Sequence, residues 1–209
     1  MNAVDGKFKE RDYCIITLFL NCGMRLSELC GLNLSDIRAD GTMRLLGKGN
    51  KERIVYINDA CDAAIKAYLA VRPNDSIEYA DRNALFISRN KKRILPQTVE
   101  KNLKTYCRVA GITDPDKMHP HALRRTFACN LIADGVDIKM VAELMGHKNI
   151  EVTHRYYTQY ASERRKQVMR SLDMFPKLSR ERKVLETMML YIPLAHQLGL
   201  YNIKSEMEN

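Results

Sequence analysis

The sequence lacks several features that would place a protein in a membrane, outside the cell or around a metal ion. Its 209 residues contain no apolar run near the ~18–20 residues of a membrane-spanning helix, and the first residues form no signal-peptide core. No two of the six cysteines form a C-x-x-C pair, and most of them interrupt apolar helical stretches. We therefore expect reduced, buried thiols, no membrane association and a cytoplasmic location.

Acidic residues are also fewer than basic ones. Asp and Glu number 25 against 34 Lys and Arg, which gives a formal net charge of +9 and a sequence pI near 9.3. Such an excess is typical of proteins with an acidic partner, nucleic acid first among them, although a merely soluble basic protein can have it too. Hydrophobic residues make up 45% of the chain, enough for the core of one domain.

The pattern of apolar and turn residues predicts an α+β domain that is mainly helical, with a small antiparallel sheet. Helices are predicted over 11–22, from an N-cap at Ser27 to Leu32, and over 59–71, 97–110, 122–134, 138–145 and about 150–160. Strands are predicted over 43–46 and 53–57, with a weaker hairpin over 84–88 and 93–95. The sequence has no internal repeat and no low-complexity linker.

Six residues, far apart in the sequence, together supply the chemistry needed to break a DNA backbone without a metal ion. They are Arg25, Lys48, His121, Arg124, His147 and Tyr156. Attack on a phosphodiester builds negative charge on its non-bridging oxygens, and guanidinium groups bind such oxygens bidentately while keeping their own charge. The two arginines are the expected phosphate clamp, imidazoles can transfer protons, and a tyrosine hydroxyl can attack phosphorus.

Each of the six residues lies in a distinctive local sequence. These are Gly23-Met24-Arg25-Leu26-Ser27-Glu28-Leu29, Gly47-Lys48-Gly49-Asn50-Lys51-Glu52-Arg53, His121-Ala122-Leu123-Arg124-Arg125 and Met145-Gly146-His147, with Tyr156 nine residues after His147. Taken singly, each side chain would be assigned to the surface or to a helix end. Together they resemble the tyrosine recombinases, the class of phage integrases and Xer proteins, over residues 5–165.

The resemblance implies a role for each matched position. Lys48, at the tip of the first hairpin, would protonate the departing 5′-oxygen. His121 would accept the tyrosine proton or bond the phosphate, and His147 would donate to a non-bridging oxygen. Glu28 also matches and would support its neighbours. The remaining basic residues of these motifs are expected to contact the DNA backbone, and they are Lys51, Arg53 and Arg125.

Two assignments stay open at this point. Tyr156 has the usual spacing from the histidine and follows an arginine, but the adjacent Tyr157 is a rival nucleophile because insertions occur in this loop. Tyr160 is more consistent with packing. A metal site at His119-x-His121 is the competing interpretation of the histidines, but no third ligand is evident, so we expect no metal and no cofactor.

The C-terminal tail, residues 166–209, is predicted to be helical and to have no activity of its own. Its stretch Tyr191-Ile192-Pro193-Leu194-Ala195-His196-Gln197-Leu198-Gly199-Leu200-Tyr201 resembles an internal piece of the RelA/SpoT ppGpp synthetase/hydrolases. The tail is too short to hold either active site of those enzymes. It stands where a recombinase usually has the helix exchanged between protomers, which places tetramer assembly in doubt.

The resemblance implies a site-specific recombinase or integrase that forms a 3′-phosphotyrosyl intermediate on double-stranded DNA without metal or ATP, usually as a homotetramer. Members usually carry an N-terminal helical domain before residues like these, so weak and salt-sensitive DNA binding is expected. A non-catalytic DNA-binding remnant is the main alternative. A type IB topoisomerase-like nicking enzyme and a ppGpp-related regulator are the others, the last resting on the tail alone.

Overall fold

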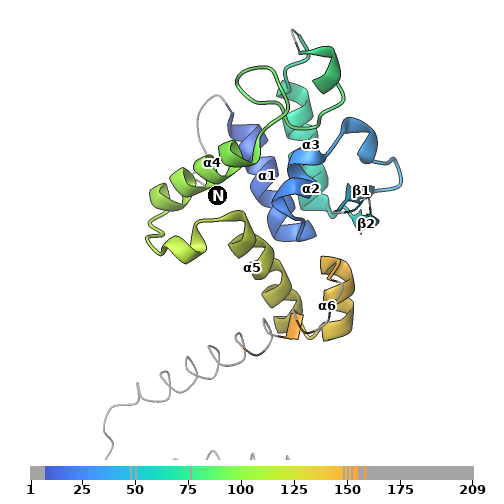
Figure 1. Ribbon diagram of the computed structural model, residues 1–209, viewed down its shortest axis with the longest axis vertical. Helices are drawn as coiled ribbons and strands as arrows, with labels where there is room; N and C mark the ends of the chain where they lie inside the picture. Colours follow the sequence, from blue (N-terminus) through green and yellow to red (C-terminus); the bar gives the residue numbers. More distant parts are fainter. Residues whose placement is uncertain are drawn as a thin grey trace, which may run out of the picture. The chain divides into compact units, whose positions relative to one another are not determined.

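The computed structural model describes residues 8–47, 49, 51–75, 77–147, 149, 151, 153, 154 and 158. The helices among them are α1 (Lys9–Cys22), α2 (Leu26–Gly31), α3 (Asp59–Val71), α4 (Pro96–Val109), α5 (Pro120–Ala133) and α6 (Ile138–Met145) (Figure 1). Strands β1 (Thr42–Leu46) and β2 (Glu52–Tyr56) form an antiparallel pair. This arrangement confirms the predicted fold class. None of the described helices is long and apolar enough to cross a membrane.

The main hydrophobic core surrounds α1, which packs against α3 and α5 (Figure 1). Its largest fully buried side chains include Tyr68, Phe19, Phe86, Leu18, Met24, Leu29, Met43 and Leu45. The rings of Tyr68 and Phe86 stack with centroids 5.4 Å apart. Five of the six cysteines are buried, Cys129 is half-buried, and none forms a disulfide, as the sequence predicts.

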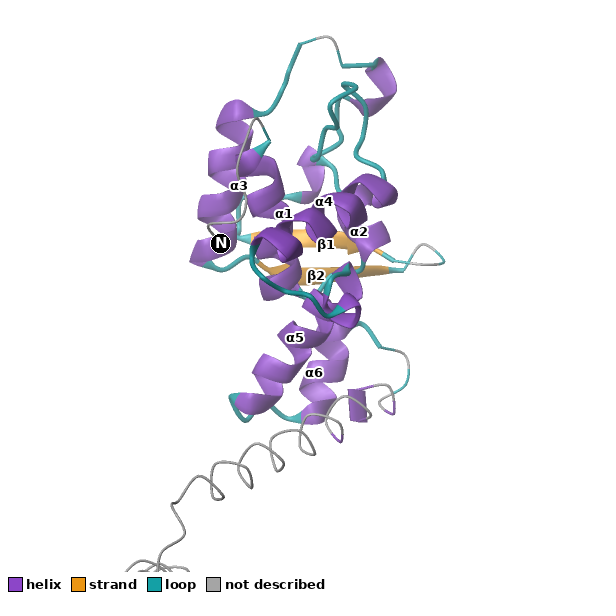
Figure 2. Cartoon of the chain, turned by 90° about the vertical axis from the view of Figure 1, so that its left-hand side faces the viewer, coloured by secondary structure: helices purple, strands orange, loops and turns teal. Residues whose placement is uncertain are grey.

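The two-stranded sheet pairs Thr42 with Tyr56 and Leu46 with Glu52, so its ends lie within one residue of the predicted ones. Met43, Leu45 and Val55 point into the core because side chains alternate along a strand. The connecting loop, 47–51, is closed by a 2.7 Å hydrogen bond from the Gly47 N–H to the Lys51 carbonyl. Figure 2 shows this sheet with α5 and α6 side by side beyond it.

The weaker hairpin does not form regular strands, and its prediction is wrong in that respect. Only one bridge, Ile87 to Arg93, joins its two arms within the described residues. The two arms are joined only over a short stretch, where the Ser88 N–H donates to the Lys92 carbonyl at 2.7 Å and the Ile94 N–H donates to the Phe86 carbonyl at 2.9 Å. On its other edge the first arm is bound by the Leu32 carbonyl, which accepts from the Leu85 N–H at 2.8 Å, and by the buried Arg72, which donates to the carbonyls of Leu85 and Ala84 at 3.1 and 2.7 Å. These contacts satisfy the backbone of the arm without a regular strand.

The starts of two helices differ from the prediction. Helix α2 begins at Leu26 with Arg25 as its N-cap, not at an N-cap Ser27, because the Glu28 carboxylate accepts from the Arg25 backbone N–H at 2.7 Å. Helix α5 begins at Pro120, two residues earlier than predicted. Proline is favourable in a first helical turn, and Nδ1 of His119 accepts from the Ala122 N–H at 3.1 Å.

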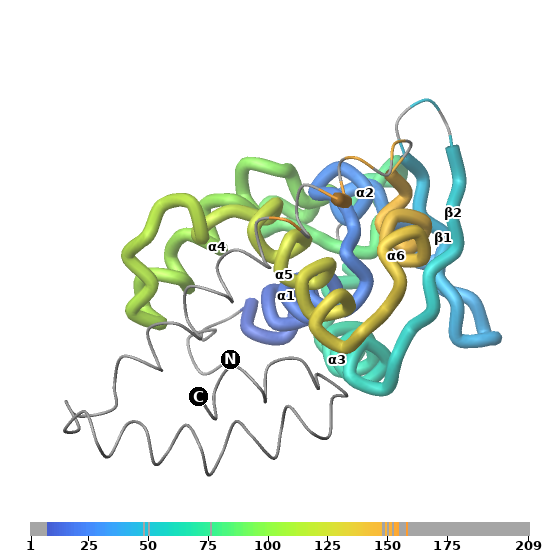
Figure 3. Tube along the Cα trace, turned by 90° about the horizontal axis from the view of Figure 1, so that it is seen from below, coloured from blue at the N-terminus to red at the C-terminus, as the bar shows by residue number. Residues whose placement is uncertain are grey.

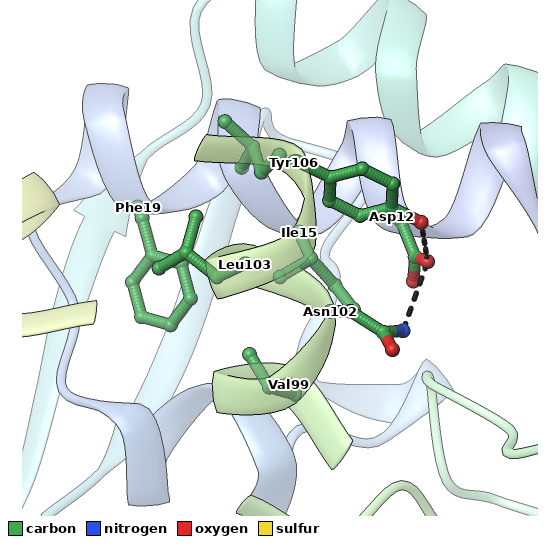
Figure 4. A pocket seen from close by; sticks show the side chains of 8 residues that line it. Asp12, Ile15, Phe19, Val99, Asn102, Leu103 and Tyr106 are labelled. Carbon is green, nitrogen blue, oxygen red and sulfur yellow. Dashed lines mark hydrogen bonds between the residues drawn. The ribbon is translucent and has the colours of Figure 1, made fainter. Parts of the chain in front are cut away.

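Helix α4 packs on α1 around a polar cluster at one end of an apolar groove (Figure 4). The Asp12 carboxylate accepts from Tyr106 at 2.5 Å, from Asn102 at 3.0 Å and from the adjacent Arg11 at 2.8 Å. Burial, together with this carboxylate, raises the pKa of Tyr106, which therefore stays a protonated donor. The predicted helix at 150–160, the domain boundary at 165 and the tail lie outside the described residues, apart from a few positions.

Candidate active site

Arg25 and Glu28 are held together at the start of α2. The carboxylate accepts from the backbone N–H and from Nη1 of Arg25, both at 2.7 Å. Burial by itself raises the pKa of Glu28, but the bond from Arg25 and the charge of Arg53 outweigh it and hold that pKa below its usual range. The Glu28 side chain is 1% exposed and that of Arg25 is 39% exposed, so an ionised, buried anion fixes a cation that solvent still reaches.

Three arginines from three different elements donate to three consecutive carbonyls at the C-terminal end of α6. Nη1 of Arg53, on β2, donates to Leu144 at 2.7 Å. Nη2 of Arg124, on α5, donates to Met145, and Nη2 of Arg25 donates to Gly146 at 2.8 Å. The last carbonyls of a helix have no partner within it and carry partial negative charge, so cations there satisfy both needs.

The close approach of these arginines requires glycine at position 146. Gly146 has φ +61°, and a Cβ atom there would lie 3.0 Å from Cδ and 3.1 Å from Nε of Arg53. Figure 3 shows α6 next to β1 and β2, and the hydrogen bond from Arg53 to Leu144 joins β2 to α6. Arg124 also donates to the carbonyl of Gly23, the residue that ends α1, so this one buried guanidinium joins α1 to α6.

His147 is the residue after Gly146, and the pKa of its imidazole is strongly lowered. Burial, together with the charges of Arg124, Arg25 and Arg53, lowers its pKa to about 4, so the imidazole is neutral at pH 7. Its Nδ1 lies 2.8 Å from Oγ1 of the buried Thr153. Thr153 is a site residue that the sequence analysis missed, because a threonine near a histidine carries no signal of its own.

His121 lies in the first turn of α5 beside an open cleft. The cleft has a volume of about 290 Å³ and is lined by Arg25, Arg124, His121, His119, Glu100, Met24, Leu26 and Pro120. The rings of His119 and His121 are nearly parallel, with centroids 6.2 Å apart. Burial and the charge of Arg124 lower the pKa of His121. Within the described ranges, no three potential metal ligands converge.

The structure therefore brings together four of the six predicted catalytic residues, Arg25, His121, Arg124 and His147. Arg25, His121 and Arg124 line the cleft. His147 follows the end of α6, where Arg25 and Arg124 donate to the carbonyls of Gly146 and Met145. Lys48, Tyr156 and the rival Tyr157 lie outside the described residues. Of the predicted DNA contacts, Lys51 is exposed, Arg125 is half-buried, and Arg53 is bound to protein acceptors.

Comparison with solved structures shows the class of protein to which this fold belongs. The crystal structure of the XerA recombinase matches 81% of this chain and 60% of its own, with a TM-score of 0.65 and 29% identity. The Tn1549 transposon integrase in complex with circular intermediate DNA covers 74% of this chain and 56% of its own, with a TM-score of 0.57 at 25% identity. The fold is therefore that of the recombinase catalytic domains.

Residues 1–164 match the model of the phage integrase family, and the chain belongs to that family. The tyrosine recombinase XerC of Caldanaerobacter subterraneus subsp. tengcongensis is 46% identical over 157 residues, 75% of this chain and 43% of that protein. XerC of Myxococcus xanthus is 38% identical over 167 residues, 76% of this chain and 53% of that protein. The chain thus spans about half the length of these relatives.

Proposed function

We propose that this domain is the catalytic part of a site-specific recombinase that cleaves and rejoins double-stranded DNA through a 3′-phosphotyrosyl intermediate. The tyrosine oxygen attacks the scissile phosphorus, the bond to the 5′-oxygen breaks, and a 5′-hydroxyl leaves. A partner strand's 5′-hydroxyl then attacks the phosphotyrosyl bond and releases the tyrosine. The observation that carries the proposal is the cleft in which Arg25, Arg124 and His121 meet.

The contacts of Arg25 suit it to a phosphate. Its bonds to Glu28 and Gly146 use one hydrogen on each terminal nitrogen, and its side chain is 39% exposed. A guanidinium has five N–H donors, so donors remain for a non-bridging oxygen without loss of the contacts that orient the group. A preorganised charge of this kind contributes roughly 3–4 kcal/mol to a transition state in enzymes with oxyanion sites.

The neutral state of His147 suits it to donate a hydrogen bond rather than to carry charge. When the Thr153 hydroxyl donates to Nδ1, the single proton of the neutral ring is on Nε2. That nitrogen is then a donor toward phosphate. His121, whose pKa is also lowered, is suited to accept the proton of the tyrosine.

The roles of Lys48 and Tyr156 rest on the sequence. Lys48 is the central residue of the Gly-Lys-Gly turn between β1 and β2, and we propose that it protonates the leaving 5′-oxygen. Tyr156, nine residues after His147, is the proposed nucleophile, with Tyr157 as the alternative. Nearby cations favour the phenolate of a tyrosine, whose usual pKa is about 10.

DNA is the proposed partner, and no metal ion or ATP enters the reaction because the phosphoester energy is kept in the covalent link. Lys51 and Arg125 are proposed contacts to the DNA backbone. Four protomers on two duplexes are the assembly that the family resemblance implies, and the tail in the place of the exchanged helix puts that assembly in doubt for this chain. The tail, 166–209, is proposed to have no independent activity. Removal of residues 166–209 is then expected to leave cleavage by the domain intact.

A nicked suicide substrate, incubated in EDTA and run on a denaturing gel, tests the proposal. Wild type, Tyr156→Phe and Tyr157→Phe are compared on DNA bearing candidate sites. A covalent protein–DNA band that disappears only in Tyr156→Phe supports the mechanism and the nucleophile. A band lost only in Tyr157→Phe moves the nucleophile by one residue. Binding without a band at low salt overturns the catalytic proposal and leaves a DNA-binding domain.

A further inference from the structure

We infer that Arg53 is a positioning residue that ties the β1–β2 hairpin to the end of α6 and thereby sets the place of His147, and that it is not a contact to DNA. The inference deepens the proposed function and rests on it for the consequence in catalysis. Its structural part, that Arg53 acts within the protein, stands on contacts that are present without DNA.

The guanidinium of Arg53 is engaged by protein acceptors on both of its terminal nitrogens. Nη1 donates to the Leu144 carbonyl at 2.7 Å, and Nη2 donates to Oε2 of Glu28 at 2.8 Å. The side chain is only 16% exposed, and its Nε is buried without a hydrogen-bond partner among the described residues. Lys51, two residues earlier, is exposed, as expected of a residue that contacts the DNA backbone.

If Arg53 left its protein acceptors to bind a DNA phosphate, the protein would lose stabilising contacts, whereas an exposed lysine could bind a phosphate without such a loss. The Glu28 carboxylate is 1% exposed, and it would lose one of its two cationic partners. A buried carboxylate that loses a partner is strongly disfavoured, because water does not replace the lost bond. The Leu144 carbonyl at the end of α6 would lose its donor at the same time.

The position of Arg53 gives it influence over two parts of the site. The side chain of Arg53 lies against Gly146, the residue before His147, so that a Cβ atom there would come within 3.0 Å of Cδ and Arg53 would have to move. Arg53 also pairs with Leu45 in the sheet, close to the 47–51 loop that connects the two strands and contains Lys48. A Cβ added to Gly47 would lie 3.5 Å from Oε1 of Glu28, so the start of this loop lies beside the carboxylate whose other oxygen binds Arg53.

The planar shape of the Arg53 guanidinium, and not its charge alone, accounts for these contacts. The two terminal nitrogens of one planar group reach a carbonyl on α6 and a carboxylate on α2, which a lysine ammonium, a single point charge, does not reproduce. Loss of this geometry is expected to displace His147 rather than to weaken binding. A small displacement of a catalytic group can reduce a rate about 100-fold.

The first test is the salt dependence of DNA binding. Each phosphate contact contributes about 0.9 to the slope of log K against log salt concentration on duplex DNA. Arg53→Gln is expected to have the wild-type slope, whereas Lys51→Ala serves as the reference for a lost contact. A slope for Arg53→Gln that falls by about 0.9 overturns the inference. This measurement needs binding only, so it remains decisive when the domain does not cleave.

The second test is a double-mutant cycle on single-turnover cleavage of the nicked substrate. Arg53→Lys is expected to lower the cleavage rate about 10–100-fold with an unchanged Kd. In a His147→Asn background the same change is expected to lower the rate less than about 2-fold, because the residue it positions is gone. Equal losses in both backgrounds overturn the inference. Arg53→Lys keeps the charge, so it also serves where Arg53→Gln does not fold.

A spectroscopic readout separates failure of the inference from failure of the proposed function. The imidazole 15N shifts of His147 report its tautomer and surroundings in the protein without DNA. They are expected to change in Arg53→Lys and to stay as in the wild type in Lys51→Ala. Unchanged shifts in Arg53→Lys overturn the inference even when wild-type cleavage is observed.

Discussion

Glu28 and Arg53 form a buried ion pair, with Oε2 of the carboxylate 2.8 Å from Nη2 of the guanidinium. The same carboxylate accepts two hydrogen bonds from Arg25, so a single anion orients the arginine proposed to bind phosphate and the arginine that reaches α6. Both carboxylate oxygens are acceptors only, which matches three donors around them. An amide of the same shape offers one acceptor and one donor, and the donor would face a guanidinium.

Glu28→Gln is therefore expected to lower the free energy of unfolding by about 2–4 kcal/mol, because it removes the buried anion that pairs with the half-buried Arg53 and turns an amide donor toward a guanidinium. Urea denaturation measures this change. Glu52→Gln is the matched control, since Glu52 pairs with Arg44 at 3.1 Å but is 50% exposed, and an exposed pair is worth about 0–1 kcal/mol. Similar losses in the two variants would contradict a special role for Glu28.

Gly146→Ala tests the contact between α6 and Arg53. Gly146 and Gly135 both have positive φ, +61° and +83°, but only at Gly146 does an added Cβ meet a neighbour, Arg53. Gly135→Ala is expected to cost about 1–2 kcal/mol from backbone strain alone. Gly146→Ala is expected to cost about 1–3 kcal/mol more, since Arg53 must move. Thermal or urea unfolding of both variants measures the difference, and equal costs would contradict the contact.

The sequence predicted the elements of this domain well where the signal was local. Helix α3 has the predicted bounds because Asn58 caps it and Pro73 follows it, both visible in the sequence. The start of α2 was misassigned because a serine is the usual N-cap, whereas here the Glu28 side chain binds the backbone of Arg25. The second hairpin was overestimated because its two arms meet in one isolated bridge, while Leu32 and Arg72, both distant in sequence, bind the other edge of its first arm.

The site was predicted as a set of residues, but its connections were not. Motif spacing indicated that Arg25, His121, Arg124 and His147 act together, and the fold brings them together. The sequence could not show that three arginines bind consecutive carbonyls of α6, because a guanidinium donates to a carbonyl or to a phosphate with the same atoms. Which acceptor each meets depends on tertiary structure alone.

The lowered pKa of His147 predicts how stability depends on pH. An unfolded histidine takes up a proton near its usual pKa of about 6.5, whereas folded His147 does so only near 4. Between these values the unfolded state binds more protons, so stability decreases as the pH falls from about 6.5 toward 4. His147→Asn is expected to flatten this decrease. Urea midpoints above about pH 5 avoid most carboxylate titration, and an equal slope in wild type and variant would contradict the assignment.

Gly23, at the end of α1, allows a test of the second arginine contact, in which Arg124 donates to the Gly23 carbonyl. Gly23 has φ +54°, and a Cβ there would lie 2.2 Å from the ring of Phe127. Gly23→Ala is therefore expected to cost about 2–4 kcal/mol, from backbone strain plus a clash with a packed ring.

Phe127→Ala in the same chain removes the ring and serves as the partner of a double-mutant cycle. The cost of Gly23→Ala is expected to fall to about 1–2 kcal/mol in that background, because the ring clash is gone and only the backbone strain and a 3.0 Å approach to Sδ of the flexible Met145 remain. Urea denaturation of the four proteins measures the interaction. A cost that is the same with and without Phe127 would show that the ring does not restrict Gly23, and that the strain of the left-handed backbone alone requires glycine next to Arg124.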